Sequence, residues 1–293
     1  MCLLSAVIVV SGIMLISSLR ALKKGDDLYK PLESEFRFII GGNDTAAPVT
    51  SGPADSTTTT SPVVTTPPEG GEDSEPDDHD NNDVTDPEEP TIPEPNYSEK
   101  FKSIRNYLLD KQKINIDIIG YIIIDFSNTE SITYPVVLGN DNEFYVTHAF
   151  DKSELKAGSI FLDCRNNANP EANRVSVIYG HNMINGSMFG KLTNFKQKKY
   201  FDNVKITLYS LYGIYTYEVF SVYNTTSDGD FSKVHFNSDT EYLSHIKGLQ
   251  SKSLLSKNIT LTESSRVLTL STCINTNSTS RLAVHAVLTN IER

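Results

Sequence analysis

The stretch Val267-Leu268-Thr269-Leu270-Ser271-Thr272-Cys273 is an apolar run of β-type residues that ends on a cysteine. Its alternation of large apolar with small polar residues is typical of a strand that is buried on one side. The C-terminal end of such a strand would lie at the surface, where a thiol can act as a nucleophile. A lone cysteine after an apolar run is nevertheless more often a core residue. The role of Cys273 therefore has to be inferred from other segments of the chain.

Two other segments offer the partner groups that a thiol nucleophile needs. The strand-like run Val175 to Tyr179 leads into Gly180 and His181, and the glycine permits a sharp turn at that point. Arg281 opens the last β-type run, eight residues after Cys273. An imidazole, with an ordinary pKa of about 6.5, can protonate a leaving amine, and a guanidinium can stabilise an oxyanion. Taken singly, both residues could equally be ordinary surface groups.

The other cysteines give no sign of disulfides or metal binding. Cys2 and Cys164 bring the total to three, so at least one thiol stays unpaired and no disulfide framework is predicted. Cys164 follows a strand-like run and is expected to be a buried or half-buried core thiol. The chain has no CxxC or HxxxH spacing, so we predict no metal site and no cofactor.

Negative charge is concentrated between residues 43 and 96. This stretch holds fourteen Asp or Glu, no Lys or Arg, and ten of the thirteen prolines. The remaining chain has 26 basic and 23 acidic residues, so the net charge of -11 belongs to the linker. A nearly neutral folded part argues against nucleic-acid binding. Because prolines, low apolar content and like charges oppose folding, we predict a disordered stalk over residues 25–96.

The N-terminal run from Cys2 to Leu19 contains eighteen residues without a charge. At ~1.5 Å per residue it spans ~27 Å, close to the hydrocarbon core of a bilayer. Residues 1–24 are therefore predicted to be a membrane anchor with its flank. A cleaved signal peptide is the alternative, but the run lacks a basic n-region and a clear cleavage site before Arg20.

The charges after this run complicate its orientation. Arg20, Lys23 and Lys24 follow the span, and the positive-inside rule would place them in the cytoplasm. Either the native start lies upstream and supplies further basic residues, or the large domain is translocated despite these charges. We favour an upstream start.

From residue 97 onward the pattern is that of a globular domain. Apolar residues fall at helical spacing over Ser98 to Gln112 and over Asp239 to Ser256, which predicts two helices. Seven or more β-type runs indicate a β-barrel. The predicted strands are Ile118 to Ile124, Ser159 to Leu162, Val175 to Tyr179, Val204 to Tyr209, Tyr215 to Tyr223, Val267 to Thr272 and Leu282 to Thr289.

Three motifs together resemble one enzyme family. TLSTC at 269–273, YGHNM at 179–183 and MFGKL at 188–192 are similar to the active-site signature of the sortases, membrane-anchored cysteine transpeptidases of Gram-positive bacteria, and most like class B. The resemblance covers about residues 97–293. It implies a mostly β fold, a closed eight-stranded barrel with an N-terminal helix and a helix inserted before the cysteine strand, preceded by a transmembrane helix and a disordered linker.

The resemblance also implies roles for individual residues. Cys273 would attack a threonine carbonyl within a C-terminal sorting signal of a secreted protein and hold the product as a thioester. His181 would be the general acid and base, and Arg281 would steady the oxyanion or the substrate backbone. The substrate-binding residues implied are Ser271, Thr272 and Asn182.

The expected acceptor is an amine of a cell-wall precursor or of a pilin lysine. The enzyme would be a single-pass protein of the cell membrane, with its catalytic domain outside the cell. Two alternatives remain: a hydrolytic thiol peptidase, and a catalytically silent surface-binding scaffold that has kept the barrel. The presence of all three candidate catalytic residues argues against the scaffold, and the anchor and stalk favour the transpeptidase.

Overall fold

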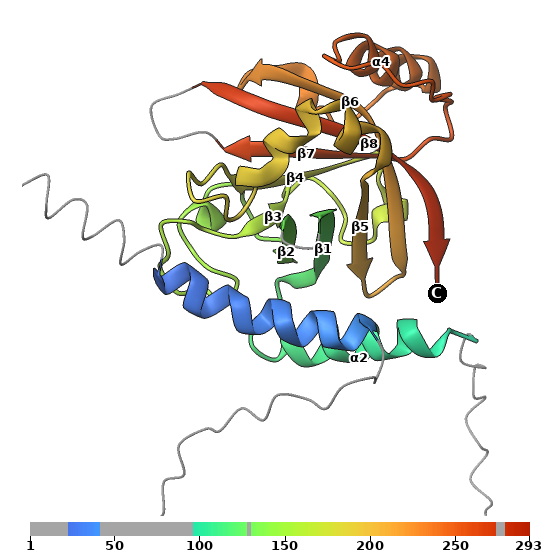
Figure 1. Ribbon diagram of the computed structural model, residues 1–293. Coiled ribbons are helices and arrows are strands. Elements are labelled where there is room, and N and C mark those ends of the chain that lie inside the picture. Colours follow the sequence, from blue (N-terminus) through green and yellow to red (C-terminus); the bar gives the residue numbers. More distant parts are fainter. Residues whose placement is uncertain (1–22, 42–95, 128–129, 274–278) are drawn as a thin grey trace, which may run out of the picture. The chain divides into compact units, whose positions relative to one another are not determined.

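The computed structural model describes residues 23–41, 96–127, 130–273 and 279–293. The strands are β1 Ile118–Ser127, β2 Glu130–Val137, β3 Ile160–Leu162, β4 Val175–His181, β5 Lys205–Ser210, β6 Ile214–Thr226, β7 Val267–Cys273 and β8 Ser280–Glu292. They close into one barrel in the order β1-β2-β3-β4-β7-β8-β6-β5 (Figure 1). The predicted mostly β fold with an eight-stranded barrel is thereby confirmed.

All seven predicted strands are present, but the prediction missed β2. This strand carries Pro135, and a proline without an N–H counts against a strand. β2 pairs with β1 along most of its length, whereas β3 joins it only from Val136 onward. At Pro135 one edge of β2 thus has no ladder partner, so the missing donor is tolerated.

The helices frame the barrel at its ends and on one outer face. α2 (Glu99–Gln112) begins at Ser98, whose hydroxyl accepts a hydrogen bond from the Phe101 amide. α4 (Asp239–Ser251) is the predicted helix in the connection before β7, and it ends five residues earlier than predicted. The other helices after residue 96 in the described part of the chain are α3 Lys198–Asn203 and the short 3-10 helices η1 Phe144–Val146, η2 Pro170–Ala172, η3 Gly190–Lys196 and η4 Asp230–Ser232.

Alternate residues of the central strands enter two different cores. In β7, Leu268 and Leu270 pack inside the barrel, while Val267 belongs to a second cluster on the outer face. α4 covers that outer cluster with Tyr242 and Ile246, both fully buried. This two-sided burial fixes the register of β7, since a slip by one residue would exchange its two faces.

The N-terminal helix formed by residues 23–41 corrects the predicted domain boundaries. Residues 25–96 were expected to be disordered throughout, but the first part of that range is helical and belongs to the same compact unit as the barrel. Tyr29, Leu32 and Phe36 lie three and four residues apart and form one buried stripe. The ring of Phe36 stacks on Tyr121 with centroids 4.1 Å apart. Residues 42–95 lie outside the described residues.

Within the described part of the chain, no helix is long and apolar enough to cross a bilayer. The predicted span from Cys2 to Leu19 lies outside that part.

Candidate active site

The parallel pair β4 and β7 places His181 beside Cys273. The two strands are in register from Val175 opposite Val267 to His181 opposite Cys273. Neighbouring strands lie about 4.8 Å apart, and both residues are the last of their strands. The side chain of Cys273 is outside the part of the chain that the structure describes.

The loop that follows His181 folds back tightly against β4. The Phe189 amide donates to the His181 carbonyl at 2.9 Å, and the Phe189 ring is buried against Gly180. A side chain at position 180 would clash with Phe189 and with the Ile160 side chain. The glycine before the histidine is therefore required by this close approach.

Arg281 approaches the same edge from the other side of β7. The last registered pair of the antiparallel strands β7 and β8 is Ser271 opposite Ala283. Cys273 follows Ser271 by two residues, and Arg281 precedes Ala283 by two residues. Because the two strands run antiparallel, both steps lead toward the same end of the strand pair. Because the sheet order is β4-β7-β8, the backbone position of Cys273 falls between those of His181 and Arg281. The fold thus brings the three predicted catalytic residues to one barrel edge.

The imidazole of His181 is oriented by a main-chain carbonyl. Its Nε2 atom lies 2.8 Å from the Val146 carbonyl oxygen, and the ring is half-buried. A carbonyl can only accept a hydrogen bond, so Nε2 carries the proton. In the neutral ring Nδ1 is then the basic nitrogen. The sequence could not predict this contact, because any residue type supplies a carbonyl.

The segments around the Val146 carbonyl are closely packed. The neighbouring carbonyl of Tyr145 accepts from the Ser159 amide at 2.9 Å. Gly158 has a φ of 57°, and a Cβ at that position would lie 2.5 Å from the Val146 oxygen. The Tyr29 hydroxyl donates to the Gly158 carbonyl at 3.0 Å. The N-terminal helix therefore supports the turn against which His181 is oriented.

The predicted substrate-binding residues lie in different environments. Ser271 and Thr272 are fully buried. The Thr272 hydroxyl accepts from the Leu282 amide at 3.1 Å and so ties β8 to β7. These two residues shape the cysteine strand and present no surface to a ligand. Asn182 is half-buried, and its backbone bridges to Met188; its predicted role in substrate binding stays a prediction.

A buried carboxylate that the sequence analysis did not single out lies against β4. Asp163 is fully buried and accepts from Arg165 Nη2 at 2.6 Å and from the Tyr179 hydroxyl at 2.9 Å. Burial alone would raise the pKa of Asp163, but the hydrogen bonds from Arg165 and Tyr179 outweigh it and leave that pKa lowered. Asp163 is therefore an ionised, fully paired group that anchors the strand leading to His181.

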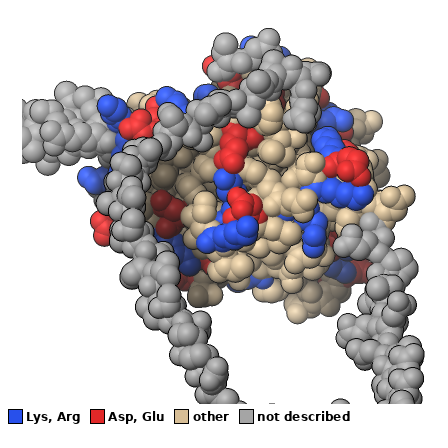
Figure 2. Space-filling model, turned by 90° about the horizontal axis from the view of Figure 1, so that it is seen from below, with Lys and Arg blue, Asp and Glu red and all other residues tan. Residues whose placement is uncertain are grey.

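The part of the chain that the structure describes shows mixed surface charge and no cluster of metal-binding groups. On the face seen from below, Lys and Arg side chains are interspersed with Asp and Glu (Figure 2). Among the described residues, no three His, Cys, Asp or Glu side chains lie together in a way that could hold a metal ion. Cys164 is a half-buried free thiol, as expected.

Comparison with known proteins identifies relatives over the barrel. The model of the sortase domain matches residues 132–289, which include His181, Cys273 and Arg281. Sortase B of Listeria monocytogenes is 34% identical over 176 residues, which cover 58% of this chain and 68% of that protein.

Two solved structures agree with this assignment. The X-ray structure of Clostridium perfringens sortase B has 35% identity and a TM-score of 0.57, and the match covers 62% of this chain and 99% of that one. A Staphylococcus aureus sortase B-substrate complex has 29% identity and a TM-score of 0.59, over 64% of this chain and 86% of that one. Because the sortase model matches more than half of the chain and these relatives are sortase B proteins, the chain belongs to the sortase family as a class B sortase, a cysteine transpeptidase.

Proposed function

We propose that this enzyme cleaves a C-terminal sorting signal of secreted proteins after a threonine and transfers the protein to an amine. The acceptor would be an amine of a cell-wall precursor or a pilin lysine. The observation that carries the proposal is the register that sets His181 opposite Cys273, with Arg281 two residues past the last β7–β8 pair. The substrate complex of the Staphylococcus aureus sortase B supports a substrate-binding role for the shared barrel.

In the acylation step, Nδ1 of His181 takes the thiol proton of Cys273, and the sulfur attacks the threonine carbonyl to form a tetrahedral intermediate. Arg281 stabilises the negative charge on the oxygen. The carbon–nitrogen bond then breaks, His181 protonates the leaving amine, and the threonine carbonyl remains as a thioester. Because Nε2 is committed to the Val146 carbonyl, Nδ1 is the nitrogen that exchanges this proton.

In the second step, the acceptor amine attacks the thioester and His181 takes its proton. The carbon–sulfur bond breaks, His181 returns its proton to the sulfur and restores the thiol, and a new amide joins the protein to its acceptor. Water in place of the amine would give the hydrolytic peptidase instead, so the choice of acceptor distinguishes the two enzymes.

The proposed location is the cell membrane, with a single span and the catalytic barrel outside the cell. The uncharged run from Cys2 to Leu19 supports this proposal, since it has the length of a membrane span. Fusion of an enzymatic reporter to the C-terminus would test it, because a periplasmic or surface reporter becomes active only outside the cytoplasm.

The decisive experiment uses residues 23–293, which include the N-terminal helix. The protein is incubated with a small library of fluorogenic sorting pentapeptides, with and without an amine acceptor, and intermediates are trapped for mass spectrometry. We expect a thioester on Cys273 and a product that depends on the amine. Cys164→Ala is the matched control, because it removes a free thiol away from the strand end and should keep the adduct.

Cys273→Ala should remove the adduct without changing the unfolding midpoint. If no peptide forms an adduct although Cys273 can be alkylated in the wild-type protein, the transpeptidase assignment fails and the scaffold alternative gains support.

A further inference from the structure

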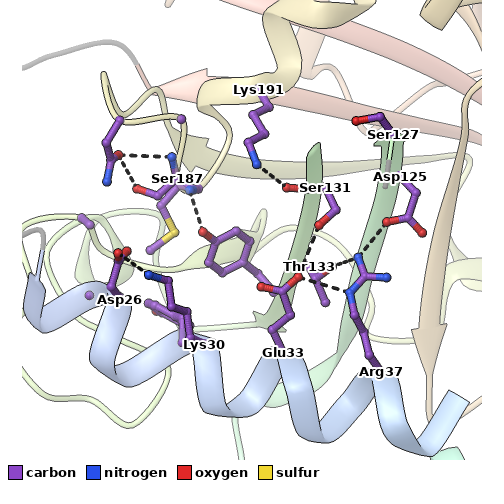
Figure 3. A pocket seen from close by; sticks show the side chains of 17 residues that line it. Asp26, Lys30, Glu33, Arg37, Asp125, Ser127, Ser131, Thr133, Ser187 and Lys191 are labelled. Atoms are coloured by element: carbon purple, nitrogen blue, oxygen red, sulfur yellow. Dashed lines mark hydrogen bonds and ion pairs between the residues drawn. The ribbon is translucent and has the colours of Figure 1, made fainter. Parts of the chain in front are cut away.

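A cleft of about 880 Å³ lies between the N-terminal helix, the adjoining ends of β1 and β2, and the loop after His181 (Figure 3). This volume is in the range of sites that bind small molecules or short peptides. Figure 3 shows side chains from all three segments pointing into the same space.

One wall of the cleft is connected directly to the strand end that carries His181. That wall is formed by residues 185–188. Met188 bridges to Asn182, and the next residue, Phe189, donates its amide proton to the His181 carbonyl. The Met188 amide also donates to the Tyr134 hydroxyl of β2, a second lining residue. A ligand in the cleft thus lies against the loop that leaves the catalytic histidine.

The floor of the cleft is polar, and its charged side chains are joined in ion pairs. Asp26 pairs with Lys30 at 2.8 Å. Arg37 pairs with Glu33 at 3.2 Å and with Asp125 at 2.7 Å. These five side chains sum to one net negative charge, and Lys191 brings the cleft lining to zero, so the cleft does not select a strongly charged ligand. Such walls suit a peptide, whose amide groups can exchange hydrogen bonds with paired polar groups.

Lys191 is the lining cation that stands outside these three ion pairs. Its ammonium group enters the cleft from the side opposite the N-terminal helix, and its Nζ donates to the Ser131 carbonyl at 3.2 Å (Figure 3). No carboxylate among the described residues lies within ion-pair distance of it. An ammonium group has three donors, so further donors remain for a ligand carboxylate.

We propose that this cleft binds the acceptor, a short peptide that carries the attacking amine, and that Lys191 receives a carboxylate of that peptide. The inference rests on the proposed function. His181 gives a proton to the leaving amine and takes one from the entering amine, so both amines must approach on the His181 side of Cys273. The loop that leaves His181 on that side forms one wall of the cleft, and Lys191 provides a site for the acceptor's far end.

The experiment compares two acceptors that differ only in a carboxylate, triglycine and triglycinamide. KM is measured for each with the wild-type protein of residues 23–293 and with Lys191→Ala, Lys191→Arg and Lys247→Ala. Lys247 is an exposed lysine of α4, outside the cleft lining, and serves as the matched control. Thioester formation without acceptor is recorded separately for every protein.

We expect Lys191→Ala to raise KM for triglycine by roughly two- to five-fold relative to triglycinamide, the size of one solvated ion pair. Lys191→Arg should restore most of the difference, and Lys247→Ala should leave the ratio at its wild-type value. An equal change for both acceptors, or no change for either, would overturn the inference. Absence of any thioester in the wild-type protein would instead remove the proposed function, and the inference with it.

Discussion

Replacement of His285 should remove a large part of the acid sensitivity of the fold. His285 lies on β8 beneath α4 and is fully buried. Its Nδ1 is 2.9 Å from the Thr269 hydroxyl, its ring stacks on Tyr223 with centroids 5.4 Å apart, and its Nε2 has no hydrogen-bond partner. Burial lowers the pKa of His285 from its ordinary 6.5 to about 3, and the nearby His245 and Lys252 add to this effect.

The sign and size of the effect follow from proton linkage. Between pH 6.5 and pH 3 the unfolded chain binds a proton at this residue and the folded chain does not, so stability falls as the pH falls through this window. From pH 8 to pH 5 the loss is about 2 kcal/mol, and by pH 3 it is about 4 kcal/mol. Few carboxylates are protonated above pH 5, so the first part of the window isolates histidine.

The assay is urea denaturation of residues 23–293 at several pH values between 8 and 5. In His285→Gln, which can keep a hydrogen bond to Thr269, the decrease in unfolding free energy should be smaller by about 2 kcal/mol than in the wild type. His235→Gln is the matched control, because it removes an exposed imidazole and should preserve the wild-type slope. If His285→Gln loses as much stability as the wild type between these pH values, the buried neutral histidine is not the cause.

Three further substitutions test other contacts. Phe36→Ala should lower the free energy of unfolding by about 3–5 kcal/mol in urea titrations, because a fully buried ring is lost from the contact with the barrel; a loss below about 1 kcal/mol would contradict firm docking of the helix. Gly158→Ala should reduce kcat while KM for the donor peptide stays within two-fold, since its Cβ would displace the carbonyl that orients His181; a wild-type kcat would refute this positioning. Arg165→Ala should destabilise the fold by about 1–3 kcal/mol at pH 7 and by less at pH 4, where the buried Asp163 can be protonated, and a pH-independent loss would exclude the charge as the reason.

The barrel was predictable from the sequence because its central strands carry strong local signals. β4 and β7 are short runs of β-branched and apolar residues, and each ends at a residue that the active-site motif marks. β2 was not predictable in the same way, since Pro135 interrupts its pattern and only the pairing with β1 explains it. The inserted helix α4 was recognised from its periodic apolar residues, but its end was placed too late because Leu254 continues the spacing without being buried.

The catalytic residues were predicted from a motif, whereas their supports were not. Cys273, His181 and Arg281 were named because TLSTC, YGHNM and MFGKL resemble the active-site signature of the sortases. The partner of the histidine ring is a main-chain carbonyl, and its position depends on a tyrosine from a helix more than 100 residues earlier in the chain. Sequence patterns encode neither of these, because both arise only when distant segments pack together.

The docked N-terminal helix changes the role that can be given to the acidic segment after it. A stalk separates two bodies only if one body lies at each end. Here the helix of residues 23–41 and the barrel from residue 97 onward belong to one compact unit, so both ends of the segment 42–95 attach to the same body. Three residues separate Leu19 from the first described helical residue. With residues 2–19 as the proposed anchor, the catalytic unit would be held beside the bilayer, and its distance from the membrane would not depend on the length of the acidic segment.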